Sequence, residues 1–125
     1  MSRKQTLALV AHDAKKSMLI DWARPRVDVL AKFDLYATGT TGGRLHDDLG
    51  LTVIRMKSGP LGGDAQLGAM IAEGRLDGLI FFTDPLSALP HDVDVKSLLR
   101  LAVYYDIPLA MSPASAAAIL GLLAT

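Results

Sequence analysis

The stretch LTVIRMKSGPLGGDAQLGAMIAEGRLDGLIFF, residues 51–82, contains a complete strand–helix–strand pattern. The apolar runs at 51–56 and 77–82 have the length and composition of buried strands. Between them, apolar residues recur at the spacing of one helix face over 63–74. A strand that returns to its own sheet through a helix runs parallel to the first strand. The stretch therefore predicts an α/β fold built around a parallel sheet.

The same alternation of strand and helix extends over the rest of the chain. Further apolar runs predict strands at 5–12, 33–38 and 107–111. Helical spacing predicts helices within 15–30, 41–50, 93–106 and 112–124. Pro25 is expected to interrupt the first of these helices, Gly50 to end the second, and Ser112 to be the N-cap of the last. We expect a single domain over residues 1–125, with a three-layer α/β/α arrangement around a five-stranded parallel sheet.

The composition narrows the classes of function. Half of the residues are hydrophobic and the formal net charge is zero, so nothing indicates binding to nucleic acid or to an acidic membrane surface. The absence of cysteine excludes disulfides and thiolate metal sites, and without an HxH or HExxH spacing no metal site is expected. The longest apolar stretch, residues 116–124, is far shorter than the roughly 20 residues of a membrane span. We expect a soluble, cytoplasmic protein.

Polar residues and glycines gather where the predicted strands end. His12 and Asp13 follow the first strand, TGTTGG (38–43) the second, KSGPLGGD (57–64) the third and TDPLSALPHD (83–92) the fourth. In parallel α/β sheets the carboxyl ends of the strands meet at one edge, and ligands bind there. The binding site is therefore expected at this edge.

The run TGTTGG, residues 38–43, has the composition of an anion-binding turn. Glycines allow close approach of the backbone, N–H groups at the start of a helix attract anions, and threonine hydroxyls add donors. The run matches neither GxGxxG nor GxxxxGK[ST], which favours a single phosphate, although a simple strand-to-helix turn remains an alternative. SGPLGG, residues 58–63, is a second such run. Lys16 would supply a positive charge unless it is an ordinary exposed helix lysine.

Asp64 is the candidate general base. It stands at the start of a predicted helix, where the helix dipole alone already favours an aspartate. If the carboxylate instead faces a bound phosphate and is partly desolvated, its proton affinity rises toward neutral pH, as a base requires. Asp13, Asp84 and Asp94 belong to the same region or serve as caps and turn residues.

Two of the three histidines, His12 and His91, belong to the same predicted edge. A lone histidine more often has a structural role, but two at one edge raise the expectation of a functional one. His46 lies inside a predicted helix and is expected at the surface.

Four segments in order resemble the methylglyoxal synthase family: LVAHDAKK, LYATGTTGG, KSGPLGGDAQLGAMIAEGRLDGLIFFTDPL and PHDVDVKSLLRLAVYYDIPLA. The similarity covers residues 7–118, nearly the whole chain. The resemblance implies a methylglyoxal synthase-like fold of the Rossmann or flavodoxin type. It also implies conversion of dihydroxyacetone phosphate to methylglyoxal and inorganic phosphate, with no cofactor and no metal.

The resemblance assigns roles to individual residues. Asp64 matches the base that removes a carbon-bound proton and forms an enediolate. His91 matches the group that polarises the carbonyl and moves protons between the oxygens, with Asp94 near it. Asp13 and Asp84 match other polar positions of the family site. Contacts to the substrate and its phosphate are implied for His12, Lys16, Thr38, Gly39, Thr40, Thr41, Ser58 and Gly59.

The resemblance also implies a homohexamer that phosphate inhibits. Family members carry a C-terminal arginine that reaches the phosphate of a neighbouring subunit, whereas this sequence has no arginine after Arg100. Either Lys15, Lys16 or Arg24 compensates, or phosphate affinity and allosteric coupling are weaker, or the sequence is incomplete. Two other functions stay open at this point. One is a non-catalytic effector-binding module, like the regulatory domain of carbamoyl phosphate synthetase, and the other is a phosphosugar isomerase.

Overall fold

The computed structural model describes residues 4–86 and 92–124, and the side chains of residues 60 and 92–95 are outside this description. The described chain forms a sheet of five strands in the order β3-β2-β1-β4-β5. Every pair of neighbouring strands is parallel, which confirms the predicted α/β fold. The strands are β1 (Thr6–Ala11), β2 (Asp34–Thr38), β3 (Val53–Met56), β4 (Gly78–Phe82) and β5 (Leu109–Ala110).

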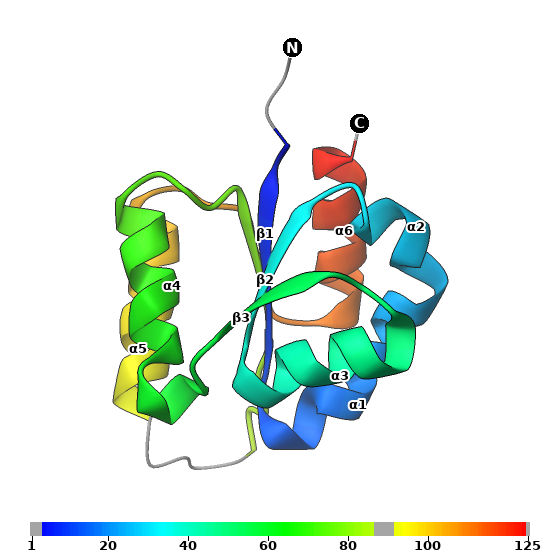
Figure 1. The fold of residues 1–125 in the computed structure, drawn as a ribbon. Coiled ribbons are helices and arrows are strands. Elements are labelled where there is room, and N and C mark those ends of the chain that lie inside the picture. Colours follow the sequence, from blue (N-terminus) through cyan, green and yellow to red (C-terminus); the bar gives the residue numbers. More distant parts are fainter. Residues whose placement is uncertain (1–3, 87–91, 125) are drawn as a thin grey trace.

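Helices cover both faces of the sheet and complete the three layers (Figure 1). One face carries α1 (Lys16–Ala23), α2 (Val27–Leu30), α3 (Gly39–Leu49) and α6 (Pro113–Leu123). The other face carries α4 (Gly63–Ala72) and α5 (Asp92–Tyr104). Three short 3-10 turns lie between these elements: η1 (Asp13–Lys15), η2 (Arg24–Arg26) and η3 (Gly59–Leu61).

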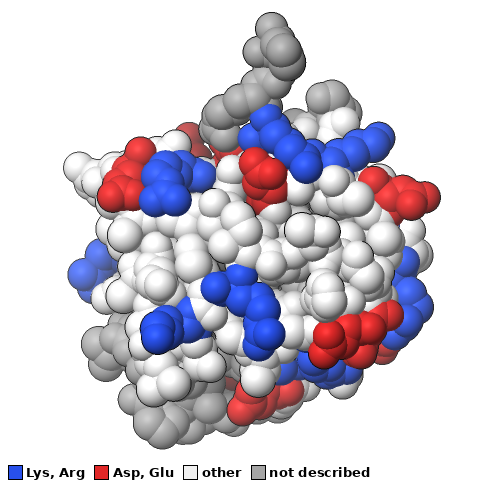
Figure 2. All heavy atoms as spheres, in the orientation of Figure 1, with Lys and Arg blue, Asp and Glu red and all other residues white. Residues whose placement is uncertain are grey.

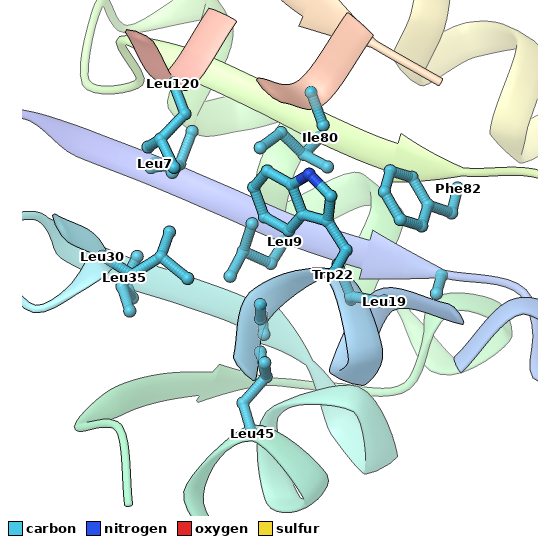
Figure 3. Close-up of a cluster of buried hydrophobic side chains, with 14 of the residues drawn as sticks. Leu7, Leu9, Leu19, Trp22, Leu30, Leu35, Leu45, Ile80, Phe82 and Leu120 are labelled. Atoms are coloured by element: carbon cyan, nitrogen blue, oxygen red, sulfur yellow. The ribbon is translucent and has the colours of Figure 1, made fainter. Parts of the chain in front are cut away.

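The central strand β1 is buried along its whole length because both of its faces are covered. Leu7 and Leu9 point into one apolar cluster, with α1, α2, α3 and α6, whereas Ala8 and Val10 point into the other, with α4 and α5. Figure 3 shows Trp22 of α1 lying across the first cluster. Each leucine buried in this way contributes about 1.5–3 kcal/mol to folding. The continuous apolar pattern of the strand is thus the signature of its central place in the sheet.

The residues that were predicted to interrupt, end or cap helices largely do so. Pro25 lies in η2, which separates α1 from α2. Gly50 follows α3 in the left-handed conformation with φ of 71° and closes the helix. Ser112 occupies the N-cap of α6, but its hydroxyl pairs with Ser115 Oγ at 3.2 Å and makes no bond to the helix backbone.

Helix α3 begins earlier than the sequence predicts. It starts at Gly39 rather than at residue 41, directly after the extended Thr38. The run TGTTGG is therefore mostly helix and not loop. A side chain from β3 packs against Gly42 and Gly43, which explains why a helix contains two glycines here.

All carboxyl ends of the strands lie at one edge of the sheet, toward the bottom of Figure 1. The chain order of the strands reverses at β1, which pairs with β2 on one side and with β4 on the other. Crevices at such reversals are where α/β sheets bind ligands. No helix of the described chain is long and apolar enough to cross a bilayer.

Candidate active site

A cavity of about 630 Å³ opens at the carboxyl edge of the sheet, beside the reversal at β1. Its wall combines residues that follow four different strands with the first turns of α1, α3 and α4. The apolar part of the wall includes Phe81 and Leu61, which sequence reasoning did not place in a site. The predicted site residues in the wall are His12, Asp13, Lys16, Thr38, Gly39, Thr40, Ser58, Gly59, Asp64 and Asp84.

Three predicted site residues are not among the described residues of this wall. Thr41 is buried in the first turn of α3. His91 lies outside the described residues, and Asp94 belongs to α5 but its side chain is outside the description. His46 is exposed, as predicted, and contacts Asp47.

Asp64 places a buried carboxylate against bare backbone. The residue is only 5% exposed and belongs to the first turn of α4. A Cβ atom built on Gly59 would lie 3.2 Å from Asp64 Oδ1 and 3.5 Å from Oδ2. Glycine at position 59 therefore allows the carboxylate to lie close to the backbone of the preceding loop. Both residues line the cavity, so the carboxylate is at the position that a general base for a bound molecule requires.

The glycines of the run SGPLGG form a tight reversal between β3 and α4. Gly62 has a φ of 114°, which favours glycine. The N–H of Gly63 donates to the carbonyl of Ser58 at 3.0 Å, and a Cβ on Gly63 would lie 2.0 Å from the carbonyl oxygen of Lys57. Only glycine allows this approach, which brings the start of α4, and with it Asp64, back against the end of β3.

His12 is held in one orientation by the segment after β4. The backbone N–H of Asp84 donates to His12 Nδ1 at 3.0 Å. The ring also meets Phe81 edge-on, with ring centroids 5.2 Å apart. Because Nδ1 accepts a hydrogen bond, the neutral ring carries its hydrogen on Nε2, which is then a donor. His12 thus fits the role of a donor to an oxygen atom of a ligand.

Asp84 acts as a turn residue. Its Oδ1 accepts a hydrogen bond from the backbone N–H of Leu86 at 3.1 Å, two residues further on, the pattern of an Asx turn. The sequence left this role open as the alternative to a place in the site. Asp84 also lines the cavity, and its backbone N–H orients His12.

Lys16 lies at the rim of the cavity and is paired with Asp13. The lysine side chain is 14% exposed and the aspartate side chain 99% exposed, so Lys16 is not an ordinary surface lysine. An ion pair with one fully exposed partner contributes little to stability. The ammonium group can therefore exchange Asp13 for an anion that enters the cavity.

The start of α3 supplies further donors. Thr38, its N-cap residue, makes no side-chain capping bond. A Cβ on Gly39 would lie 2.5 Å from Ser58 Oγ, so glycine here lets the Ser58 hydroxyl approach the helix start. Thr41 is 2% exposed, and within the described part of the chain its Oγ1 has no hydrogen-bond partner. Helix N–H groups and hydroxyls in this arrangement fit the oxygens of a phosphate.

Gly42 and Gly43 do not have the role that the sequence suggested. Neither lines the cavity, and both lie inside α3 against Arg55 of β3. Sequence reasoning missed Arg55 altogether. The available signal was a pair of helix glycines followed by a long side chain on the next strand.

Within the described residues, no group of three or more histidine, aspartate or glutamate side chains is arranged to hold a metal ion.

The sequence model of the MGS-like domain family matches residues 18–111. A methylglyoxal synthase from Agrobacterium fabrum is 61% identical over 117 residues, which are 93% of this chain and 92% of that protein. Another methylglyoxal synthase, from Rhizobium meliloti, is 56% identical, with 93% of each chain covered. The crystal structure of methylglyoxal synthase from Elizabethkingia anophelis NUHP1 has a TM-score of 0.89 and 51% identity, covering 94% of this chain and 77% of that one. The chain belongs to the methylglyoxal synthase family.

Proposed function

We propose that this protein is a methylglyoxal synthase, a carbon–oxygen lyase that converts dihydroxyacetone phosphate to methylglyoxal and inorganic phosphate. The observation that carries the proposal is the buried carboxylate of Asp64, which faces bare backbone at Gly59 in the same cavity as the anion donors of α3. The family membership and the 61% identity to a methylglyoxal synthase point to the same activity.

The reaction begins with removal of a proton from the hydroxymethyl carbon, next to the carbonyl. Asp64 is the proposed base, since it lines the cavity and its buried carboxylate lies close to the backbone of Gly59. The electron pair of the broken C–H bond forms an enediolate, whose oxygens need donors. A proton moves from the hydroxyl of the former hydroxymethyl group to the neighbouring oxygen, and the enediolate then expels phosphate from the other terminal carbon as that group becomes an aldehyde. The resulting enol gains a proton on its terminal carbon, loses the proton on its oxygen and becomes methylglyoxal.

The remaining wall residues are assigned to binding. The N–H groups at the start of α3, the Ser58 hydroxyl and the Lys16 ammonium group form the proposed phosphate site. A phosphate held in this way is also a stabilised leaving group, because the same donors balance the charge it gains. His12 is a proposed donor to a substrate oxygen.

His91 and Asp94 keep the roles that the family resemblance implies. His91 is proposed to polarise the carbonyl and move protons between the oxygens, with Asp94 near it. Of the three cationic residues considered as substitutes for a C-terminal arginine, Lys16 lines the described cavity wall, whereas Lys15 and Arg24 do not. Lys16 is therefore the preferred substitute.

We also propose that residues 1–125 act as one domain, because all five strands belong to a single sheet. The homohexamer, the inhibition by phosphate and the cytoplasmic location stay predictions. A non-catalytic effector module is not favoured, because curated relatives that match 93% of the chain are named as synthases.

An assay of both products tests the proposal. Purified protein is incubated with dihydroxyacetone phosphate, and methylglyoxal, free phosphate and glyceraldehyde 3-phosphate are each quantified over time. The lyase yields methylglyoxal and phosphate in equal amounts. An isomerase would yield glyceraldehyde 3-phosphate with phosphate retained, and an effector-binding module would yield neither product, so either result would refute the proposal.

A further inference from the structure

Arg55 of the edge strand β3 extends over the first turns of α3. Its Nε donates to the carbonyl oxygen of Gly39 across 3.3 Å. A Cβ on Gly42 would lie 2.8 Å from Arg55 Cγ, and one on Gly43 would lie 3.2 Å from a terminal guanidinium nitrogen. The two glycines thus leave a groove along the helix that the arginine side chain occupies. In Figure 2, Lys and Arg atoms gather across the middle of the face over β3.

The peptide group between Gly39 and Thr40 connects Arg55 to the cavity. Both residues line the cavity, whereas Arg55 is not among the described residues of its wall. In a trans peptide, the carbonyl of one residue and the N–H of the next point in opposite directions. The carbonyl of Gly39 is bound by Arg55, so the N–H of Thr40 lies at the other end of the same planar unit.

Arg55 of β3 and Lys57, just after that strand, both bind the first residue of α3. The N–H of Gly39 donates to the carbonyl of Lys57 at 3.4 Å, and its carbonyl accepts from Arg55. A charged donor on the carbonyl fixes the plane of the peptide group. It also polarises the group, which strengthens the N–H at the far end as a donor. Thr40 N–H is one of the first N–H groups of α3, which have no acceptor within the helix.

We propose that Arg55 is a positioning residue for phosphate binding at the start of α3. It orients and polarises the Gly39–Thr40 peptide group, and its charge adds to the positive end of the helix dipole. This inference rests on the proposed function for the identity of the substrate, but not for the anion site itself. It assigns to Arg55 a role in binding and none in the proton transfer by Asp64.

A different explanation of Arg55 is protection of the sheet edge. Charged side chains on edge strands prevent pairing with other chains, and Arg55 is exposed on such a strand. Under that explanation any charged residue would serve at position 55, and phosphate affinity would not depend on it.

The test is titration of the full-length protein with inorganic phosphate by calorimetry. Arg55→Met keeps a chain that packs on Gly42 but removes donor and charge. Arg55→Lys keeps the charge but places a carbon atom where Nε lies. We expect Arg55→Met to raise the Kd for phosphate about threefold to tenfold, because the Thr40 N–H is no longer oriented and polarised and one positive charge near the helix start is lost. Arg55→Lys is expected to recover less than half of that loss.

Arg75→Gln is the matched control, because Arg75 is exposed, lies just before β4 at the opposite edge and pairs with Glu73. It removes the same charge and is expected to leave the Kd unchanged. With substrate, Arg55→Met should raise KM in step with the phosphate Kd and keep kcat within about twofold. A general structural defect would instead lower kcat and the melting temperature.

The two proposals fail separately. If the wild-type protein binds phosphate but makes no methylglyoxal, the proposed function is wrong and the titrations still decide the role of Arg55. The role of Arg55 is refuted if Arg55→Met binds phosphate as tightly as the wild type, if Arg55→Lys binds with full affinity, or if the wild type binds no phosphate.

Discussion

Two glycine-rich runs follow neighbouring strands of this sheet and look alike in the sequence, yet their glycines have different structural roles. In SGPLGG (58–63) the glycines bend the chain: Gly62 has a φ of 114°, and Gly63 meets the backbone of Lys57. In TGTTGG (38–43) the glycines lie in helix α3, and two of them accommodate a side chain from the neighbouring strand. A cluster of glycines in the sequence therefore indicates that another group lies close to the backbone. It does not indicate whether that group is backbone, a side chain or a ligand.

The two runs also divide the proposed function. The first positions Asp64, the proposed base, whereas the second begins the helix at the proposed phosphate site. Changes near 59–64 should therefore affect turnover or folding, whereas changes near 38–43, and at Ser58 of the proposed phosphate site, should affect affinity. The following substitutions test this division.

Asp64→Asn should have the largest effect. Removing the general base is expected to lower kcat by a factor of about 10² to 10⁴. The Kd for inorganic phosphate should stay the same or fall, because a negative charge facing the anion is lost. Steady-state kinetics and phosphate titration measure the two quantities. Asp28→Asn, on the exposed surface of α2, is the control and should match the wild type. A near-normal kcat for Asp64→Asn would mean that another group is the base.

Gly63→Ala should destabilise the fold. The added Cβ would lie 2.0 Å from the carbonyl oxygen of Lys57, and backbone cannot yield as a flexible side chain can. We expect a loss of about 3 kcal/mol in the free energy of unfolding, measured by urea denaturation. Gly121→Ala is the control, because nothing lies within 4 Å of its added Cβ. Equal stability of the Gly63→Ala variant and the wild type would show that the reversal before α4 is not as tight as described.

Thr41→Val should separate binding from stability. The substitution removes a buried hydroxyl that has no partner within the described chain and keeps the side-chain shape. An unsatisfied buried hydroxyl costs free energy, so we expect the free energy of unfolding without ligand to rise by up to about 1 kcal/mol. Phosphate should bind about tenfold more weakly if the hydroxyl contacts it. Thr52→Val, at an exposed position, is the control. Unchanged phosphate affinity would exclude Thr41 from the site.

Gly43→Ala should have the smallest effect. Alanine favours the helix by up to about 1 kcal/mol relative to glycine. The new Cβ, 3.2 Å from a guanidinium nitrogen of Arg55, would push that mobile group aside. We expect slightly higher stability together with a phosphate Kd raised about twofold. A lower stability with unchanged Kd would contradict the account of this groove, and titration at several temperatures can resolve so small a change.

Much of the fold could be predicted because its signals are local. The apolar run of β1, the interruption at Pro25 and the closure of α3 at Gly50 each depend on neighbours in the chain. A cavity at the carboxyl edge could be expected from the parallel topology, and Asp64 lies at the start of α4 as predicted.

The parts that could not be predicted depend on contacts between distant residues. The bond from Asp84 N–H to His12 Nδ1 joins residues 72 positions apart. The contact of Arg55 with Gly39, Gly42 and Gly43 exists only because β2 and β3 pair in one register. The resemblance, by contrast, named most of the cavity wall, because it carries whole motifs rather than single residues.

The central place of β1 has a consequence for biosynthesis. Residues Leu7 to Ala11 pair with Gly78 to Phe82 of β4, so one whole side of the first strand lacks its neighbour until β4 has been made. Gly78 follows Leu7 by 71 positions, so at typical translation rates of about 5–20 residues per second it is made roughly 4 to 14 s later. During that interval the apolar strand TLALVA of the nascent polypeptide is without the neighbour that covers one of its sides in the folded sheet.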